Sequence, residues 1–172
     1  MESLPVEAPL FAFLQSCGIQ TTTVRHPPVF TVAEAKKHHT NMPGGHCKSL
    51  FVRDKKKRRA LIIVDENRRV DLKSLSGKID MGRLSFSSAD SLQRVLGITP
   101  GSVTPFALIN LQVLRGEAPA LSVVLDKKMM QQSLLYYHPL HNAATTAITP
   151  ENLLIFIRAC GYEPLIVDMD TP

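Results

Sequence analysis

The stretch GGHCKSLFVRDKKKRRALIIVDE, Gly44–Glu66, decides the fold and raises the first question about function. A glycine pair leads into two apolar runs, KSLFVRD and ALIIVDE, each short and rich in aliphatic and β-branched residues. Runs of this length and composition are typical of β-strands. The stretch therefore predicts two strands joined by a strongly basic turn.

Helical patterns occur on both sides of this hairpin. APLFAFLQSCG has apolar residues at helical spacing and a stop at Gly18, which predicts an N-terminal helix within residues 1–20. Thr31 and Glu34 occupy the two positions of a capping box at the start of a second helix. The remaining predicted helices are DLKSLSGKI, SSADSLQRVLG ending at Gly97, and the segment from Thr149 to Gly161.

Further strands are expected along the rest of the chain. Their sequences are TTTVRH, PFALIN, LSVVLDKKMM, QSLLYYHP and PLIVD. No linker, repeat or low-complexity segment separates these elements. The pattern therefore predicts one α+β domain over residues 1–172, with a mixed β-sheet surrounded by helices.

Composition places the chain among ordinary globular proteins. Of its 172 residues, 44% are hydrophobic and 20% are charged. The first residues lack the order of a secretion signal, and we find no apolar run long enough to span a membrane. The three cysteines cannot all pair with one another, so we expect a reducing, cytoplasmic setting without a membrane partner.

The positive charge is concentrated in the predicted turn. The formal net charge is +5, and a dense group of cations lies between the two strands: Lys55, Lys56, Lys57, Arg58 and Arg59. Clustered cations gain affinity for nucleic acids by releasing counterions. The same cluster is equally compatible with a hairpin tip that faces solvent.

Familiar catalytic patterns are missing from the sequence. Cys47 could be a nucleophile, but its neighbour His46 does not by itself supply a base, and a cysteine beside a strand is more often a packing residue. The six histidines form no HExxH or paired-ligand motif, and there is no GxSxG or GxxxxGK[ST] segment. We therefore expect neither a metal nor a cofactor.

Three weaker features remain. Lys48 stands at the start of an apolar strand, where it is either an edge lysine or part of a cleft. The segment Gly101–Pro105 is a GxxxP loop whose backbone amides could face a ligand or simply connect two elements. The segment His138–Thr146 is an expected loop after a strand, and it gathers polar side chains that could fix a small substrate or cap turns.

Together and in this order, these motifs resemble the prolyl-tRNA editing family, and most closely its free-standing bacterial branch that deacylates Ala-tRNA(Pro). The resemblance runs from about His26 to Val167. It implies a single α+β domain with a mixed, curled sheet. It also implies hydrolysis of the ester between a wrong amino acid and the tRNA, without a metal or a covalent intermediate.

The resemblance assigns roles to residues of this chain. The expected catalytic residues are Lys48, Gly101 and His138. The expected substrate-binding residues are Phe30, Ser102, Val103, Thr104, Pro105, Asn142 and Thr145. The basic turn is the expected tRNA contact, and the expected partners are the acceptor end of tRNA(Pro) and, transiently, prolyl-tRNA synthetase.

Two departures from the family pattern bear on specificity. The family often has asparagine where this chain has Ser49, and Asn-Asp where it has Asn110-Leu111. A deacylase for Cys-tRNA(Pro) or another small misacylated tRNA therefore stays open, as does a non-catalytic module that binds tRNA or a synthetase.

Overall fold

The predicted hairpin is the longest strand pair among the residues that the structure describes. The computed structural model describes residues 6–111 and 120–171. Strand β2 (Gly45–Arg53) pairs antiparallel with β3 (Arg59–Asp65), so that Cys47 lies opposite Asp65 and Arg53 opposite Arg59. The basic cluster forms the turn between them, as the sequence predicts.

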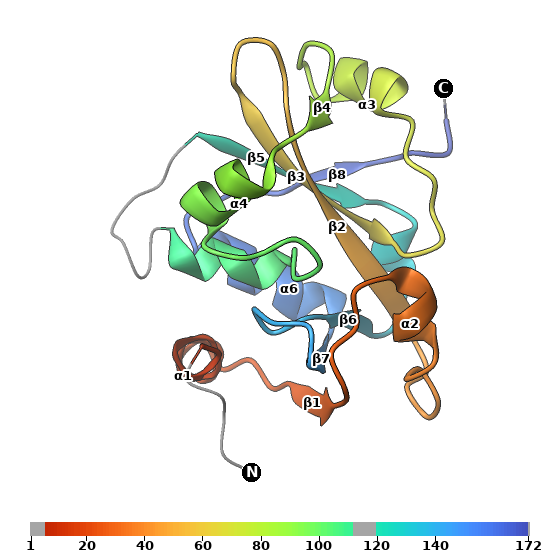
Figure 1. Cartoon of the computed structure of the whole chain (residues 1–172), viewed down its shortest axis with the longest axis vertical. Helices are drawn as coiled ribbons and strands as arrows, with labels where there is room; N and C mark the ends of the chain where they lie inside the picture. The colour runs from red at the N-terminus through yellow and green to blue at the C-terminus, as the bar shows by residue number, and fades with distance from the viewer. Residues whose placement is uncertain (1–5, 112–119, 172) are drawn as a thin grey trace.

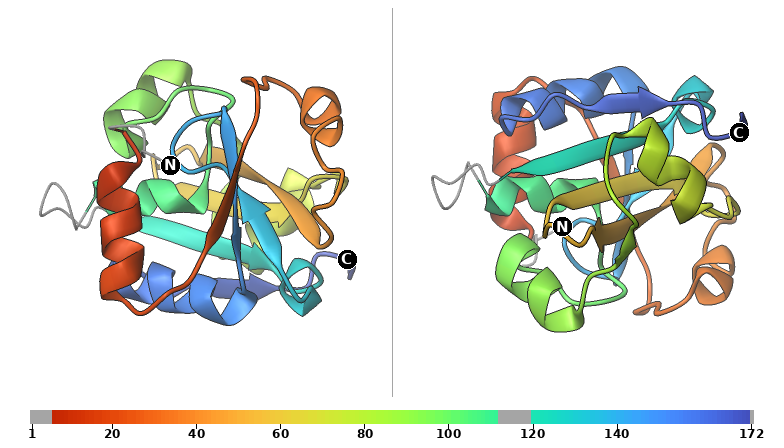
Figure 2. Two further views of the ribbon diagram at one scale, coloured as in Figure 1. Left: turned by 90° about the horizontal axis from the view of Figure 1, so that it is seen from below. Right: turned by 90° about the horizontal axis from the view of Figure 1, so that it is seen from above.

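The described strands form one mixed sheet around this hairpin. Its order is β1 (Thr22–Arg25), β7 (Ala144–Ile148), β6 (Leu135–Tyr137), β2, β3, β5 (Leu121–Asp126) and β8 (Leu165–Val167), while β4 (Ser85–Phe86) pairs with the end of β2. The pairs β2–β6, β3–β5 and β5–β8 are parallel, and the others are antiparallel. Figure 2 shows β1 and β7 running across the direction of β3 and β5, so the sheet is curled. The predicted α+β class is confirmed.

All described α-helices except the first begin at a hydroxyl or carboxylate side chain that caps them. The described α-helices are α1 (Ala8–Ser16), α2 (Val32–Lys36), α3 (Leu72–Lys78), α4 (Ala89–Leu96) and α6 (Pro150–Ala159). The side chains of Thr31, Asp71, Ser88 and Thr149 accept hydrogen bonds from backbone amides of the first turns. Helix α1 lies inside the predicted range 1–20 but is shorter, and residues 1–5 fall outside the described part.

The central strands bury both of their faces. Alternate residues such as Phe51, Leu61 and Ile63 pack into a large core with α1, α4 and α6. The intervening residues, such as Val52 and Ile62, pack into a smaller core under α3. Figure 1 shows α3 near the hairpin tip and α6 on the other side of β3 and β5. This double burial explains the almost continuous apolar run of β3.

Three local predictions are wrong. Pro105–Asn110, expected to be a strand, is a buried 3-10 helix, because Thr104 caps it and Pro105 has the backbone angle of a first helical position. A short 3-10 helix over Met129–Gln131 ends the strand predicted for LSVVLDKKMM early. The loop expected over His138–Thr146 ends earlier, because Ala144–Thr146 belong to strand β7, which pairs with β1 and β6.

The glycine pair before β2 allows a very close approach to β6. A Cβ atom on Gly44 would lie 2.8 Å from the carbonyl oxygen of Leu134, and the φ of Gly44 is +138°. A Cβ atom on Gly45 would lie 3.1 Å from a methyl carbon of Leu135. Side chains at these positions would push β2 away from β6.

We therefore predict that Gly44→Ala destabilises the fold by roughly 1–3 kcal/mol, because the methyl group meets backbone and the φ is unfavourable. Urea unfolding measures this change. Gly77→Ala is the matched control, since a Cβ on Gly77 in α3 meets nothing within 4 Å; it should stabilise by up to about 1 kcal/mol. Equal stabilities for the two variants would contradict the close-approach explanation.

Candidate active site

A fork in the sheet creates the cavity in which several predicted residues meet. Strand β2 pairs with β6 only over Gly45–His46 and with β4 only over Val52–Arg53. Between these pairings, the described strands leave one side of β2 open. A cavity of about 180 Å³ lies there, lined by Val29, Phe30, Thr31, Val32, Ala35, Cys47, Lys48, Ser49, Glu66, Gly101, Val103 and His138.

Lys48 lies in β2 opposite Val64 and is half-buried at this cavity. The acidic residue Glu66, which follows β3, lines the same cavity. Burial raises the pKa of Glu66, and the charges of Lys36 and Lys48 offset this only in part. The cavity therefore holds one ammonium and one carboxylate that interact electrostatically.

His138 presents a defined face to the cavity. Its Nδ1 lies 2.9 Å from the carbonyl oxygen of Ala144, so Nδ1 carries the proton and donates it. Burial lowers the pKa of His138, and the neighbouring His26 and His141 lower it further, so the ring is neutral near pH 7. The Nε2 lone pair is then available to accept a hydrogen bond from a molecule in the cavity.

The GxxxP loop contributes only part of its length to the cavity. Gly101 has a φ of +87°, and both Gly101 and Val103 line the cavity. The amide of Ser102 donates to the carbonyl of Thr99 at 3.1 Å. Thr104 caps the 3-10 helix that starts at Pro105. Ser102, Thr104 and Pro105 are buried and shape the loop rather than lining the cavity.

Phe30 stands at the mouth of the cavity and is 71% exposed. Its amide donates to a carboxylate oxygen of Glu34 at 2.6 Å. The side-chain amide of Asn142 donates to the carbonyl of Val29 at 2.7 Å, and the Val29 amide donates back to the Asn142 carbonyl at 3.1 Å. Asn142 therefore holds the segment that carries Phe30 and does not itself line the cavity.

Thr145 also acts through a neighbour. Its hydroxyl lies 2.8 Å from Nε2 of His26, whose Nδ1 lies 2.9 Å from the carbonyl oxygen of Pro27. The ring of His26 stacks on His38 with 5.1 Å between centroids and lies 6.3 Å from the ring of His138. Thr145 thus orients a histidine cluster beside the cavity.

Cys47 lines the cavity but is a poor nucleophile. Its thiol donates to the carbonyl of Gly45 at 3.2 Å. Burial raises the pKa of the thiol to about 12, so the reactive thiolate is scarce at neutral pH. These facts favour the interpretation of Cys47 as a packing residue.

The basic turn lies away from this cavity. Arg53, at the start of the turn, lies five positions after Lys48 in β2, which is roughly 17 Å at about 3.3 Å per residue. Lys55, Lys56 and Lys57 are exposed. Arg58 is bound to Asp54 at 2.7 Å and to the carbonyl of Asp80 at 3.1 Å, so it also braces the turn.

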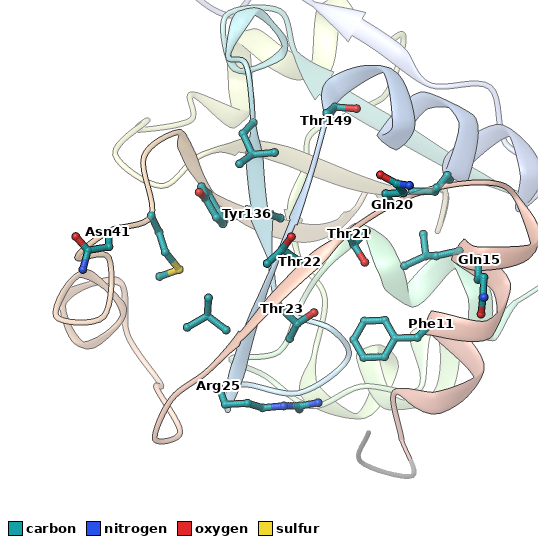
Figure 3. Close-up of a pocket in the computed structure, with 16 residues that line it drawn as sticks. Phe11, Gln15, Gln20, Thr21, Thr22, Thr23, Arg25, Asn41, Tyr136 and Thr149 are labelled. Carbon is teal, nitrogen blue, oxygen red and sulfur yellow. The ribbon is translucent and has the colours of Figure 1, made fainter. Parts of the chain in front are cut away.

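A second, larger hollow of about 870 Å³ lies elsewhere (Figure 3). Residues of α1, including Phe11 and Gln15, border it together with the β1 residues Thr22 and Thr23. Its Arg25 is paired with the buried Glu7. The hollow brings together none of the predicted catalytic residues, so the smaller cavity is the candidate active site.

Comparison with known proteins identifies the family. The model of the aminoacyl-tRNA editing domain matches residues 26–156, most of the chain. The chain belongs to the aminoacyl-tRNA editing domain family. It is accordingly an aminoacyl-tRNA deacylase, which hydrolyses the ester between an amino acid and tRNA. The resemblance to the prolyl-tRNA editing family is confirmed.

Individual members of this family are similar over nearly their whole length. Prolyl-tRNA synthetase associated domain-containing protein 1 of Xenopus laevis is 34% identical, with 94% of this chain and 95% of the relative covered. Prolyl-tRNA editing protein ProX of Acetoanaerobium sticklandii is 35% identical, with 88% and 90% covered. A solved structure called a trans-editing enzyme for prolyl tRNA synthetase shares the fold, with a TM-score of 0.74, 20% identity and 98% of both chains covered.

The described part of this editing domain offers no metal centre: residues 6–111 and 120–171 contain no group of three His, Cys, Asp or Glu side chains that could hold an ion. Within the same residues, no helix is long and apolar enough to cross a membrane.

Sequence reasoning missed Glu66 as a site residue. The hairpin register places it one position beyond the Cys47–Asp65 pair, and its amide donates to the carbonyl of His46 at 2.9 Å. The signal that identifies it is the hairpin register, which continues without a break from the Arg53–Arg59 pair to the Cys47–Asp65 pair. This register places the residue after Asp65 beside the start of β2.

We predict that Cys47→Ala retains deacylase activity within about twofold, because the thiol of Cys47 has a pKa of about 12 and takes no part in a covalent step. Steady-state deacylation measures this. Accumulation of an aminoacyl-enzyme in the wild type that the variant cannot form would contradict the prediction.

Proposed function

We propose that this deacylase acts in trans in the cytoplasm on mischarged tRNA(Pro), with Ala-tRNA(Pro) as its principal substrate. One observation carries the proposal: Lys48, Gly101 and His138, which are far apart in the sequence, line one small cavity. The names of its relatives, a prolyl-tRNA editing protein and proteins with a prolyl-tRNA synthetase associated domain, support the choice of tRNA and a transient contact with that synthetase.

Size explains why such an enzyme is needed. Alanine is smaller than proline, so a synthetase pocket shaped for proline cannot exclude it. A second site that admits alanine and excludes proline corrects the error. The cavity volume of about 180 Å³ suits a small aminoacyl group, with Phe30 and the Val29 segment closing one side.

Hydrolysis proceeds by direct attack of water on the ester carbonyl. The Nε2 atom of His138 accepts a proton from the water as its oxygen bonds to the carbonyl carbon. The ester C–O bond then breaks, and the proton passes to the departing ribose oxygen. Backbone amides of the loop at Gly101 and Val103 stabilise the oxyanion, and Lys48 binds the terminal phosphate or the developing charge.

The exposed ring of Phe30 suits the terminal adenine. Single-stranded RNA ends are commonly held by stacking on aromatic side chains, which contributes about 1–3 kcal/mol per base. Asn142 binds the carbonyl of Val29 and Glu34 binds the amide of Phe30, so the peptide group before the ring is held at the mouth of the cavity.

The test of this function is deacylation of tRNA(Pro) charged with alanine, cysteine, serine or proline by the purified protein. We expect hydrolysis of Ala-tRNA(Pro) and protection of Pro-tRNA(Pro). A preference for the cysteinyl substrate would reassign the enzyme to Cys-tRNA(Pro), and hydrolysis of none would leave the chain as a binding module.

Lys48→Ala should reduce kcat/KM for Ala-tRNA(Pro) at least about tenfold, or ~1.4 kcal/mol of transition-state stabilisation, because the variant loses the cavity's ammonium. Single-turnover kinetics measure the effect, with circular dichroism to verify folding. The control is Lys127→Ala, which removes an exposed lysine next to β5 and should leave the rate unchanged. A folded Lys48→Ala variant with normal cleavage would remove Lys48 from the mechanism.

The basic turn should hold tRNA phosphates. We predict that Lys55/Lys56→Ala weakens tRNA binding and flattens its salt dependence by a slope of nearly one per lost contact, without changing amino-acid preference. Titrations at several salt concentrations test this against Lys127/Lys128→Ala, which removes two exposed lysines elsewhere. Identical slopes for the wild type and the turn variant would mean that the turn faces solvent.

A further inference from the structure

The cavity holds a carboxylate that the proposed chemistry does not use. Glu66 lines the cavity with Lys48, and its side chain is only 9% exposed. The bond from its amide to His46 extends the hairpin by one residue and fixes its backbone. A nearly buried carboxylate is costly unless a cation or hydrogen-bond donors compensate for lost hydration.

The contacts of Glu66 within the protein provide little compensation. Among the described residues, its one ion-pair neighbour is His39, whose Nδ1 lies 3.5 Å away. Burial, together with the nearby His46 and Lys36, lowers the pKa of His39 to about 4, so this ring is neutral at pH 7. The ammonium of Lys36 donates instead to the side-chain oxygen of Asn67 at 2.6 Å. The charges of Lys36 and Lys48 lower the pKa of Glu66, but among the described residues neither lysine forms an ion pair with its carboxylate. Glu66 therefore retains the capacity to bind a cation.

The proposed substrate carries such a cation next to its reacting carbonyl group. An aminoacyl ester has a free α-ammonium group on the carbon next to the reacting carbonyl, and a phosphate at the far side of its ribose. The charged residues that line the cavity are Lys48 and Glu66, one of each sign. A ligand with one ammonium and one phosphate matches this pair of charges.

We propose that Glu66 binds the α-ammonium group of the aminoacyl ester, so that the enzyme accepts free aminoacyl-tRNA and rejects tRNA whose amino group is blocked. The inference rests on the proposed function, because it assumes an aminoacyl ester in this cavity. Recognition of the amine also orients the carbonyl toward His138 and the loop at Gly101. A bound ammonium would favour the ionised carboxylate and so oppose the effect of burial on Glu66.

A structural role for Glu66 makes a different prediction. His39 stacks on His46 with 3.5 Å between ring centroids, so Glu66 could serve only to hold the segment after α2. Loss of that support would slow the hydrolysis of every substrate equally. Loss of an amine receptor slows only the substrates with a free amine.

The kinetic test compares Ala-tRNA(Pro) with N-acetyl-Ala-tRNA(Pro) at about pH 6.5, where an α-amino group of ordinary pKa, about 7.7–8.0, is a cation. The wild type should prefer the free amine at least about tenfold. Glu66→Gln should lose at least about tenfold on Ala-tRNA(Pro) and less than about twofold on the acetylated substrate. Glu66→Asp, which keeps the carboxylate, should retain part of the preference. Glu151→Gln, which changes an exposed carboxylate in α6, should match the wild type.

Equal losses on both substrates, or none, would overturn the assignment of Glu66 while leaving the deacylase function intact. A binding measurement on the wild type tests the same inference when a variant does not fold or the substrate is not hydrolysed. Calorimetry with the stable amide 3′-alanylamino-3′-deoxyadenosine 5′-phosphate should give an affinity at least about tenfold above that of its N-acetyl derivative. Equal affinities for the wild type would overturn the inference, whichever tRNA the enzyme edits.

Discussion

The close contact between the glycine pair and β6 is the constraint on which the arrangement of the sheet depends. Gly44 and Gly45 let β2 meet Leu134 and Leu135 with no Cβ atom between the chains. Strand β2 can therefore join β6 for two residues and β3 for seven. One strand thus connects the part of the sheet that contains β1, β7 and β6 to the part that contains β3, β5 and β8.

The same constraint produces the site. Because β2 leaves β6 after His46 and reaches β4 only at Val52, one side of the strand has no neighbour among the described elements over the residues that follow the glycine pair. Those residues include Cys47, Lys48 and Ser49, which line the cavity. The α2 segment, the GxxxP loop and His138 close the space. A sheet paired along its whole length would have left Lys48 as an ordinary lysine.

Most of the fold was predictable, because the signals are local. Caps such as Thr31 and Thr149, and the stops at Gly18 and Gly97, mark helix ends by chemistry within one or two turns. The failures occurred where local patterns are ambiguous. The buried segment Pro105–Ile109 has no amphipathic period, and the β-branched residues of Ala144–Ile148 follow directly after loop-forming residues such as Pro139 and Asn142.

The site was harder to predict than the fold, because its properties arise from burial. Sequence motifs led to Lys48, Gly101 and His138, but they do not reveal that Asn142 and Thr145 act by holding Val29 and His26. Nor do they reveal protonation states. Burial keeps the thiol of Cys47 protonated and the ring of His138 neutral, so a cysteine beside a lysine is inert while a histidine from a distant loop can accept a proton. In this small cavity, desolvation assigns the chemical roles, and the fork in the sheet determines which side chains are desolvated.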